Sequence, residues 1–358
     1  MYKLEDIKIV HLEVTQRCQA ACPMCDRNQN GGALNPHIDL AELTLNDCKQ
    51  IFSLGFIKQL TAMYMCGNLG DPIMSDHTLA IMHYFRENNP SMWLSINTNA
   101  GARSSQWWQQ LAGIINKQGN VIFSVDGLED TNHIYRQNVQ WDKVKNSMQS
   151  FIAAGGRARW DFIVFEHNQH QVKEAENLAK LWGFEKFTVK KTARFFSTSR
   201  SQGKESHQSF NHKGNVTINL KKPDIDYQNA ALNREEKLIE TYGSMDAYYD
   251  QTEIRCKVKD EGNIFISAEG IVLPCCWTAG KMYKWYLKDY REEQIWQFID
   301  AVGKDNLDGR KGLANVFATG IFENIQNSWN KPTCSGGKLK ICAQKCGTDF
   351  DAFSEQFK

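Results

Sequence analysis

Three cysteines near the start of the chain have types and spacing that suit metal chemistry. Cys18, Cys22 and Cys25 follow one another as C-x3-C-x2-C within one short segment. Three thiolates on one loop can hold three irons of a four-iron cubane, and the fourth iron is then left without a protein ligand. An iron with an open coordination position is a place where a cofactor or substrate can bind and react.

Two other uses of these cysteines stay open at this stage. A structural zinc ion needs four ligands, and His11 or His37 could supply the missing one. A disulfide framework fits less well, because the chain has 11 cysteines, an odd number, and no apolar signal segment at its start. These features predict reduced thiols and a cytoplasmic protein.

The segment Cys18-Gln-Ala-Ala-Cys22-Pro-Met-Cys25 resembles the cluster-binding loop of the radical S-adenosylmethionine superfamily. The resemblance implies that S-adenosylmethionine chelates the open iron through its amino and carboxylate groups. An electron from the cluster then breaks a carbon–sulfur bond and gives a 5′-deoxyadenosyl radical. The family usually has an aromatic residue before the third cysteine, where this chain has Met24, a polarizable side chain that can pack against adenine or the cluster.

Length and charge narrow the class of protein. The 358 residues exceed what a single core usually organises, so we expect one large and one small domain. A formal net charge of +1 gives no general attraction to nucleic acid or to an anionic membrane. No apolar run approaches the roughly 18 residues that a membrane span needs. We therefore expect neither nucleic acid nor a membrane among the partners.

Strand-like apolar runs alternate with helical patterns through the first half of the chain. This alternation predicts a parallel sheet with right-handed crossovers, closed as an α/β fold of the partial (β/α)6 TIM-like barrel type. Such a barrel places its active site on the loops at the carboxyl ends of the strands. The predicted helices cover about 41–54, 76–88, 104–117, 141–154 and 170–182, and the predicted strands are Ile7–Thr15, Thr61–Cys66, Trp93–Asn97, Val121–Asp126, Trp160–Phe165 and Lys186–Lys190.

Polar and glycine-rich residues follow successive predicted strands. Glycine lets the backbone approach a ligand closely, and Asn, Ser and Asp supply the donors and acceptors that a ribose and an amino acid need. Gly70-Asp71-Pro72 resembles the family's Gly-Gly-Glu-Pro segment, whose backbone meets the methionine amino group, and Arg136 would suit pairing with the methionine carboxylate. The resemblance implies the following S-adenosylmethionine contacts: Gly70, Asp71, Asn97, Asn99, Ser124, Asp126, Arg136 and Asn168.

A second group of cysteines gathers near the C-terminal end. Cys256 precedes a hairpin-like segment, 264–274, that turns at Glu269-Gly270 and delivers Cys275 and Cys276. These thiols and the later ones make a cage for a metal centre, for which structural zinc is a competitor. The spacing resembles the SPASM or twitch extension of radical S-adenosylmethionine enzymes, which implies one auxiliary four-iron cluster. Its predicted ligands are Cys256, Cys275, Cys342 and Cys346, with Cys334 as the substitute and Cys276 as a neighbour.

These signals predict three regions in the chain. Residues 1–195 form the barrel, 196–252 a linker with exposed loops and a weak strand at Val216–Leu220, and 253–358 a small C-terminal cysteine-rich iron–sulfur domain of SPASM or twitch type.

The resemblance implies an enzyme that cleaves S-adenosylmethionine reductively and abstracts a hydrogen atom from a substrate. The first barrel strand begins by Ile7, without the added N-terminal domain that grips a leader peptide in many relatives. We therefore expect net oxidation or rearrangement of a small molecule, with flavodoxin or ferredoxin as the electron donor. The auxiliary cluster would accept an electron or anchor the substrate. No spacing singles out a catalytic acid or base among Glu13, His133, Tyr135, Glu166 and His167.

Two alternative functions remain. One is modification of a peptide or protein side chain, as in the maturation of ribosomally made peptides or of sulfatases. The other is a non-catalytic iron–sulfur protein with a redox or binding role.

Overall fold

The structure, a computed structural model, describes residues 3–195, 205–350 and 352–356. Its centre is an eight-stranded sheet with the order β10-β9-β1-β2-β3-β4-β5-β6, in which β1 to β6 run parallel to their neighbours. Each of the six predicted strands overlaps one of these six. The strands are β1 (Ile9–Leu12), β2 (Ala62–Met65), β3 (Trp93–Thr98), β4 (Gly119–Ser124), β5 (Ala158–Ile163), β6 (Lys186–Lys190), β9 (Asn263–Ile266) and β10 (Val272–Leu273).

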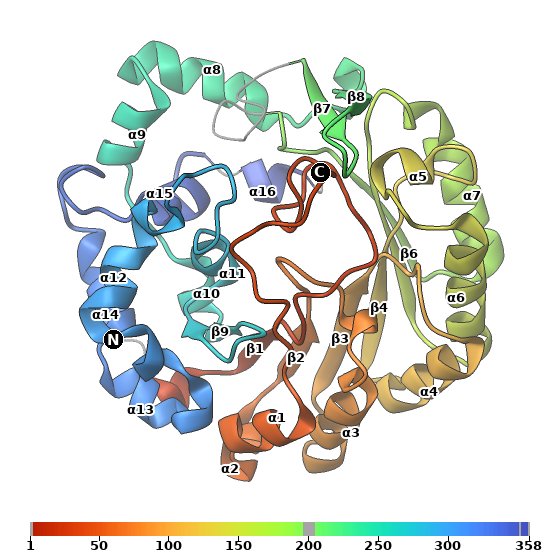
Figure 1. Cartoon of the computed structure of the whole chain (residues 1–358), viewed down its shortest axis with the longest axis horizontal. Coiled ribbons are helices and arrows are strands. Elements are labelled where there is room, and N and C mark those ends of the chain that lie inside the picture. The colour runs from red at the N-terminus through yellow and green to blue at the C-terminus, as the bar shows by residue number, and fades with distance from the viewer. Residues whose placement is uncertain (1–2, 196–204, 351, 357–358) are drawn as a thin grey trace.

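Helices cover the outside of this curved sheet, as Figure 1 shows for α3, α4, α6 and α7. The predicted helices overlap α1, α3, α4, α6 and α7, whereas α2 and α5 are additional short helices. The helices of the first half are α1 (Leu45–Ile51), α2 (Leu54–Gln59), α3 (Thr78–Asn88), α4 (Ser105–Ile115), α5 (Asn132–Tyr135), α6 (Trp141–Ala153) and α7 (Val172–Trp182). The chain is therefore a mixed α/β protein with a TIM-like sheet.

Local sequence explains where these helices begin and end. At the start of α1, the Thr44 side chain accepts a hydrogen bond from the Asp47 N–H, and the Asp47 side chain accepts one from the Thr44 N–H. These two bonds form a capping box. The Ser104 side chain caps α4 with a single bond, which it accepts from the Trp107 N–H. Gly183 ends α7 at φ +87°, a left-handed conformation that favours glycine. Between helices and sheet, Trp108 and Phe123 are fully buried in one continuous apolar core.

The predicted C-terminal hairpin is part of the central sheet. Strand β9 pairs in parallel with β1, from Ile9 opposite Asn263 to Leu12 opposite Ile266. Strand β10 returns antiparallel to β9 after a turn in which Gly270 has φ +89°. The hairpin thus extends the sheet beyond β1, a non-local pairing that alternation of apolar runs does not reveal.

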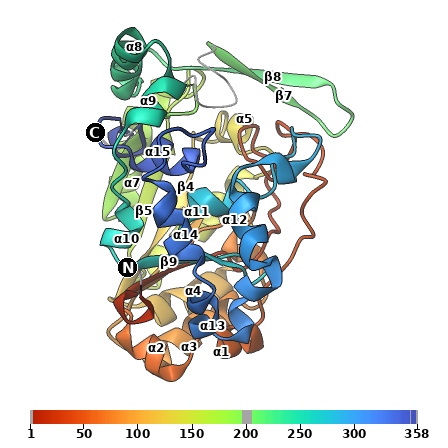
Figure 2. The same cartoon turned by 90° about the vertical axis from the view of Figure 1, so that its left-hand side faces the viewer.

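The region between the barrel and this hairpin has more regular structure than the expected linker. The weak strand at Val216–Leu220 is present as β8 (Val216–Lys221), which pairs antiparallel with β7 (Ser206–Phe210) in a separate hairpin. Figure 2 shows this hairpin at the edge of the molecule near α8 (Ala231–Tyr242) and α9 (Met245–Gln251). The polar run at 197–204 lies outside the described residues.

Short helices make up most of the C-terminal region and lie beside the open side of the sheet (Figure 1). Within the parts of the chain that the structure describes, none of the helices has the length and apolar character needed to cross a bilayer. The helices of this region are α10 (Lys257–Asp260), α11 (Cys276–Ala279), α12 (Ile295–Val302), α13 (Leu313–Ala318), α14 (Ile321–Ser328), α15 (Lys340–Cys346) and α16 (Ala352–Glu355).

Gly70 holds the loop after β2 against the loop after β1, and this contact gives a test of the fold. A Cβ atom at Gly70 would lie 1.8 Å from the Thr15 carbonyl oxygen, so Gly70→Ala must displace backbone. We expect a loss of about 3 kcal/mol in the free energy of unfolding, measured by urea denaturation. Gly113→Ala is the matched control on the exposed side of α4, where nothing lies within 4 Å. It should stabilise the protein by up to about 1 kcal/mol, and equal effects of the two variants would contradict this packing.

Candidate active site and metal centres

The segment with the first three cysteines forms a long loop between β1 and α1, which crosses the centre of the molecule in Figure 1. Backbone bonds hold its two ends together, from the Leu43 N–H to the Val14 carbonyl and from the Gln16 N–H to the Ala41 carbonyl. The buried Asn35 side chain donates to the carbonyls of Asp26 and Tyr283, at 2.9 and 2.8 Å. The loop is thus fixed both to itself and to the C-terminal region.

The three thiols of this loop lie close enough to influence one another. Each has a polar neighbour: Asn99 Nδ2 lies 3.5 Å from Cys18 Sγ, Arg136 Nη1 lies 3.9 Å from Cys22 Sγ, and Cys25 Sγ lies 4.0 Å from the Asn68 carbonyl. Burial raises the pKa of Cys22 to about 11, and the neighbouring Cys25 thiol adds to this increase. A metal that binds here must therefore displace thiol protons, as iron and zinc both do.

The two histidines considered for a zinc site contact other residues. His11 lies in β1, hydrogen-bonds the Cys66 carbonyl through Nε2 and stacks on Tyr64 at a ring-centroid distance of 4.4 Å. His37 packs against Tyr290 at 4.8 Å. Among the described residues, no three Cys, His, Asp or Glu side chains stand close enough together to hold a single ion. In a zinc site, each ligand sulfur lies about 2.3 Å from the metal ion.

Arg136 and Asp126 form a buried ion pair beside Cys22. Arg136 Nε lies 2.6 Å from Asp126 Oδ2, and the side chain of Asp126 is fully buried. The other oxygen of Asp126 accepts the Ile163 N–H at 2.7 Å. The pair therefore joins the end of β4 to the end of β5 and holds a guanidinium at the cysteine loop.

Asp71 and Asn168, two of the predicted S-adenosylmethionine contacts, have side chains that hydrogen-bond to backbone groups of neighbouring loops. The Asp71 carboxylate accepts the N–H groups of Asn99 and Ile73, at 2.8 and 3.2 Å, and burial raises its pKa. Asn168 donates to the carbonyls of Asp126 and Ile163 and accepts the Phe165 N–H.

These bonds use both donors of the Asn168 amide, so Asn168 shapes the loop after β5 and has no donor left for adenosine. Asp71 likewise fixes the loop after β3. Asn97 and Ser124 lie half-buried near the carboxyl ends of β3 and β4.

The acid and base candidates separate by environment. Glu13 is buried and accepts the N–H groups of Leu69 and Gly70, at 2.6 and 3.3 Å. Burial raises its pKa from 4.5 to about 7. Tyr135 is buried against Phe165, whereas His133 and Glu166 are exposed. His167 stacks on Phe165, and burial lowers its pKa to about 4.

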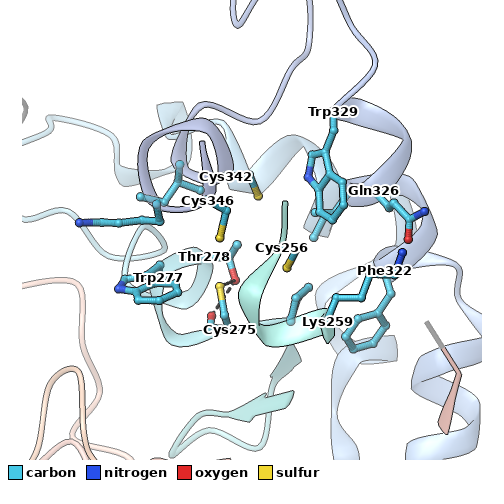
Figure 3. A pocket seen from close by; sticks show the side chains of 14 residues that line it. Cys256, Lys259, Cys275, Trp277, Thr278, Phe322, Gln326, Trp329, Cys342 and Cys346 are labelled. Carbon is cyan, nitrogen blue, oxygen red and sulfur yellow. Dashed lines mark hydrogen bonds between the residues drawn. The ribbon is translucent and has the colours of Figure 1, made fainter. Parts of the chain in front are cut away.

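The four cysteines predicted to hold the auxiliary cluster line one pocket, which we call the auxiliary pocket. Figure 3 shows the side chains of Cys256, Cys275, Cys342 and Cys346 around a common space. The pocket is largely apolar, with Phe322, Ile325 and Trp329 among its walls. The thiols of Cys256 and Cys346 contact each other, and this contact, together with burial, raises the pKa of Cys256.

The two remaining cysteines of this region lie elsewhere. The Cys334 N–H donates to Asp250 at 2.6 Å, and Cys334 does not line the auxiliary pocket. Cys276 follows Cys275 directly but lines a different and larger space, and its carbonyl accepts Asn68 Nδ2 at 2.8 Å. The structure therefore brings together the four thiols chosen as ligands and leaves out the substitute.

The larger space, the central cavity, opens to solvent and has a volume of about 540 Å³. Met24 and Asp26, on either side of Cys25, lie on its wall, as do residues after β2, β6 and α11 and on α15. Trp277, Ile341 and Lys345 line both the central cavity and the auxiliary pocket. A single layer of side chains thus separates the two spaces.

Several site residues were not found from the sequence. Arg194 donates to the Met24 carbonyl at 3.1 Å, and Gln19 Nε2 donates to Asn99 Oδ1 at 2.5 Å. Lys281 and Lys284 enter the cavity from the chain after α11. The only local sequence signal for these two lysines was their spacing, three residues apart and shortly after the pair Cys275-Cys276.

Comparison with solved structures identifies proteins that have a similar fold. The sequence matches no family model, and it has no significant match among curated proteins. SuiB of Streptococcus suis bound to S-adenosylmethionine aligns over 95% of this chain and 73% of its own, with a TM-score of 0.54 and 15% identity. The protein anSMEcpe with bound AdoMet aligns over 98% of this chain and 92% of its own, with a TM-score of 0.52 and 11% identity.

Two further structures of these proteins contain peptides. SuiB bound to the precursor peptide SuiA has a TM-score of 0.51, and anSMEcpe with AdoMet and the Cp18Cys peptide also has 0.51. This chain therefore shares its fold with SuiB and anSMEcpe, two proteins whose structures contain bound S-adenosylmethionine.

The raised pKa of Glu13 predicts a pH dependence of stability. Between about pH 4.5 and 7 the unfolded chain loses this proton while the folded protein keeps it, so the free energy of unfolding falls as pH rises through this window. Glu13→Gln keeps an oxygen acceptor for Leu69 and removes the charge. The variant should lack on the order of 2 kcal/mol of this fall, measured by urea unfolding at several pH values. Parallel pH profiles for the two proteins would contradict the assignment.

Proposed function

We propose that this protein is a radical S-adenosylmethionine enzyme, with Cys18, Cys22 and Cys25 as ligands of the cluster that binds the cofactor. The observation that carries the proposal is the position of these thiols. They lie together on one fixed loop, at the carboxyl ends of parallel strands, and the residues on either side of Cys25 line the central cavity. Three thiolates and no histidine fit a cubane with one open iron.

Cys18, Cys22 and Cys25 would hold a four-iron cluster, which when reduced would supply the electron for cleavage of a carbon–sulfur bond of S-adenosylmethionine. The chain's own residues then have positioning roles. Arg136, held by Asp126, stands beside Cys22, where a guanidinium suits the methionine carboxylate. Asn99 stands beside Cys18, and Met24 presents its side chain at the cavity wall. Asp71 and Asn168 have an indirect role, because their hydrogen bonds fix the loops that carry the positioning residues.

We propose that Cys256, Cys275, Cys342 and Cys346 hold one auxiliary four-iron cluster. Their sulfurs surround an apolar pocket whose other walls supply no carboxylate or imidazole among the described residues. The donor set fits iron–sulfur ligation by four thiolates. One layer of side chains separates this pocket from the central cavity, so a cluster held by these four cysteines would lie close enough to a substrate in the cavity to take up an electron from it.

The proposed reaction is hydrogen-atom abstraction from a small molecule, with net oxidation or rearrangement. Catalysis then depends on holding one C–H bond near the cofactor and excluding water, which are tasks for the cavity walls. Modification of a peptide side chain is a second candidate, favoured by the similarity of the fold to SuiB bound to SuiA and to anSMEcpe bound to the Cp18Cys peptide. A flavodoxin or ferredoxin is the proposed electron donor.

Cys22→Ala tests the cofactor site. Anaerobically reconstituted parent protein with S-adenosylmethionine and a strong reductant should form 5′-deoxyadenosine, measured by chromatography. The variant should form less than about a hundredth as much, because the cubane loses one of only three protein ligands. Cys48→Ala, a buried cysteine of α1, serves as the control and should retain activity. Equal product from the Cys22 variant and the parent would contradict the proposal.

Cys342→Ala and Cys334→Ser test the auxiliary site as a matched pair. The parent and Cys334→Ser should bind about eight irons and eight sulfides per chain, and Cys342→Ala should bind about four. A parent that never exceeds about four irons would rule out the second cluster, and one zinc per chain would identify the competing metal. Loss of iron in the Cys334 variant alone would overturn the ligand set.

A further inference from the structure

Positive side chains are concentrated in the wall of the central cavity. Among the described residues, one carboxylate, that of Asp26, lines the cavity together with five cationic side chains. The whole chain has a net charge of only +1, so this excess is local. The five are Lys190, Arg194, Lys281, Lys284 and Lys345.

Two of these lysines are partly withdrawn from bulk water, and each has one carboxylate partner. Lys284 pairs with Asp26, and Lys281 Nζ lies 3.5 Å from Glu293 Oε1. Their side chains are only 11% and 25% exposed. Burial lowers the pKa of Lys281, Glu293 opposes this, and the charge of Lys284 lowers it further. The site is therefore electrostatically suited to a further negative group.

Arg194 brings a third cation to the same part of the cavity. Its Nη1 donates to the Met24 carbonyl at 3.1 Å, and its guanidinium lies 5.8 Å from the centroid of the Tyr135 ring. Within the described ranges, no carboxylate lies at ion-pair distance from Arg194. Because Met24 and Asp26 flank Cys25, Arg194 and Lys284 both contact the cysteine loop at the proposed cofactor site.

The negative charge of cysteine-ligated clusters offers another explanation for these cations. Lys345 fits it, because this residue also lines the auxiliary pocket. Lys281 and Lys284 line the central cavity and not the auxiliary pocket. Arg136, with its own carboxylate partner, already stands at Cys22. The charge of the clusters thus accounts less well for Lys281, Lys284 and Arg194, which line the central cavity.

We propose that the central cavity binds a small-molecule substrate through a phosphate or carboxylate group, held by Lys281, Lys284 and Arg194. The proposal deepens the proposed function and rests on it for the reaction, but the anion site itself can be tested without turnover. Ammonium and guanidinium groups donate strong charge-assisted hydrogen bonds to both kinds of anion. Their position beside the cysteine loop would keep the anionic end of the substrate next to the reacting centre.

The experiment is a calorimetric titration of anaerobically reconstituted protein, saturated with S-adenosylmethionine so that the cofactor's own carboxylate site is filled. Inorganic phosphate and citrate are the probes for the two kinds of anion. Lys281→Gln should weaken binding of the preferred anion about tenfold, the effect of one lost charge-assisted hydrogen bond. Glu293→Gln releases the same ammonium group and should leave binding unchanged or tighter. Lys143→Gln, on the exposed face of α6, is the control.

Weaker anion binding by Lys281→Gln together with unchanged or tighter binding by Glu293→Gln supports the proposal, because a merely structural ion pair would make both variants bind more weakly. No saturable binding of phosphate or citrate to the parent protein would overturn it. A Lys281→Gln variant with shifted cluster reduction potentials and unchanged anion affinity would also overturn it, in favour of charge balance for the clusters.

Formation of 5′-deoxyadenosine is measured in the same preparations. Anion binding without cofactor cleavage would refute the proposed function alone, and cleavage without anion binding would refute this inference alone.

Discussion

Strand β9 pairs in parallel with β1, and the two candidate metal centres depend on this pairing for their relative position. Strand β1 leads into the loop with Cys18, Cys22 and Cys25, and the hairpin that begins with β9 leads to Cys275. Backbone hydrogen bonds between the two strands therefore place residues more than 250 positions apart in the sequence in one small part of the molecule. The remaining links, such as Asn35 to Tyr283 and Lys284 to Asp26, reinforce the same arrangement.

Two adjacent residues show the consequence. Cys275 faces the auxiliary pocket, and Cys276 faces the central cavity. Trp277 lines both spaces, so the wall between them is one side chain deep at this point. A wall this thin would bring a substrate in the central cavity close to the proposed auxiliary cluster. The proposed roles of the two centres thus follow from one local geometry.

The barrel strands and helices were predictable from sequence because buried parallel strands leave continuous apolar runs between helical patterns. The clustering of cysteines likewise singled out Cys256, Cys275, Cys342 and Cys346, which the structure brings to one pocket. The pairing of β9 with β1 was missed because the hairpin by itself gives no sign of a distant partner. Helices α8 and α9 were not predicted, because most of their residues are polar and the apolar positions are too few to show a clear helical period.

Individual site residues were harder to predict than elements. Asp71 and Asn168 stay predicted cofactor contacts, and the structure adds that their side chains satisfy backbone groups of neighbouring loops, which only the three-dimensional path of those loops determines. The cavity lysines and Arg194 come from separate segments, so their joint charge is invisible in any window of sequence. The measurement that tests the central claim most directly is electron paramagnetic resonance of reduced Cys342→Ala protein with and without S-adenosylmethionine. The account predicts one four-iron signal that changes when the cofactor is added, because the cofactor binds the open iron. A cluster signal that the cofactor leaves unchanged would contradict it.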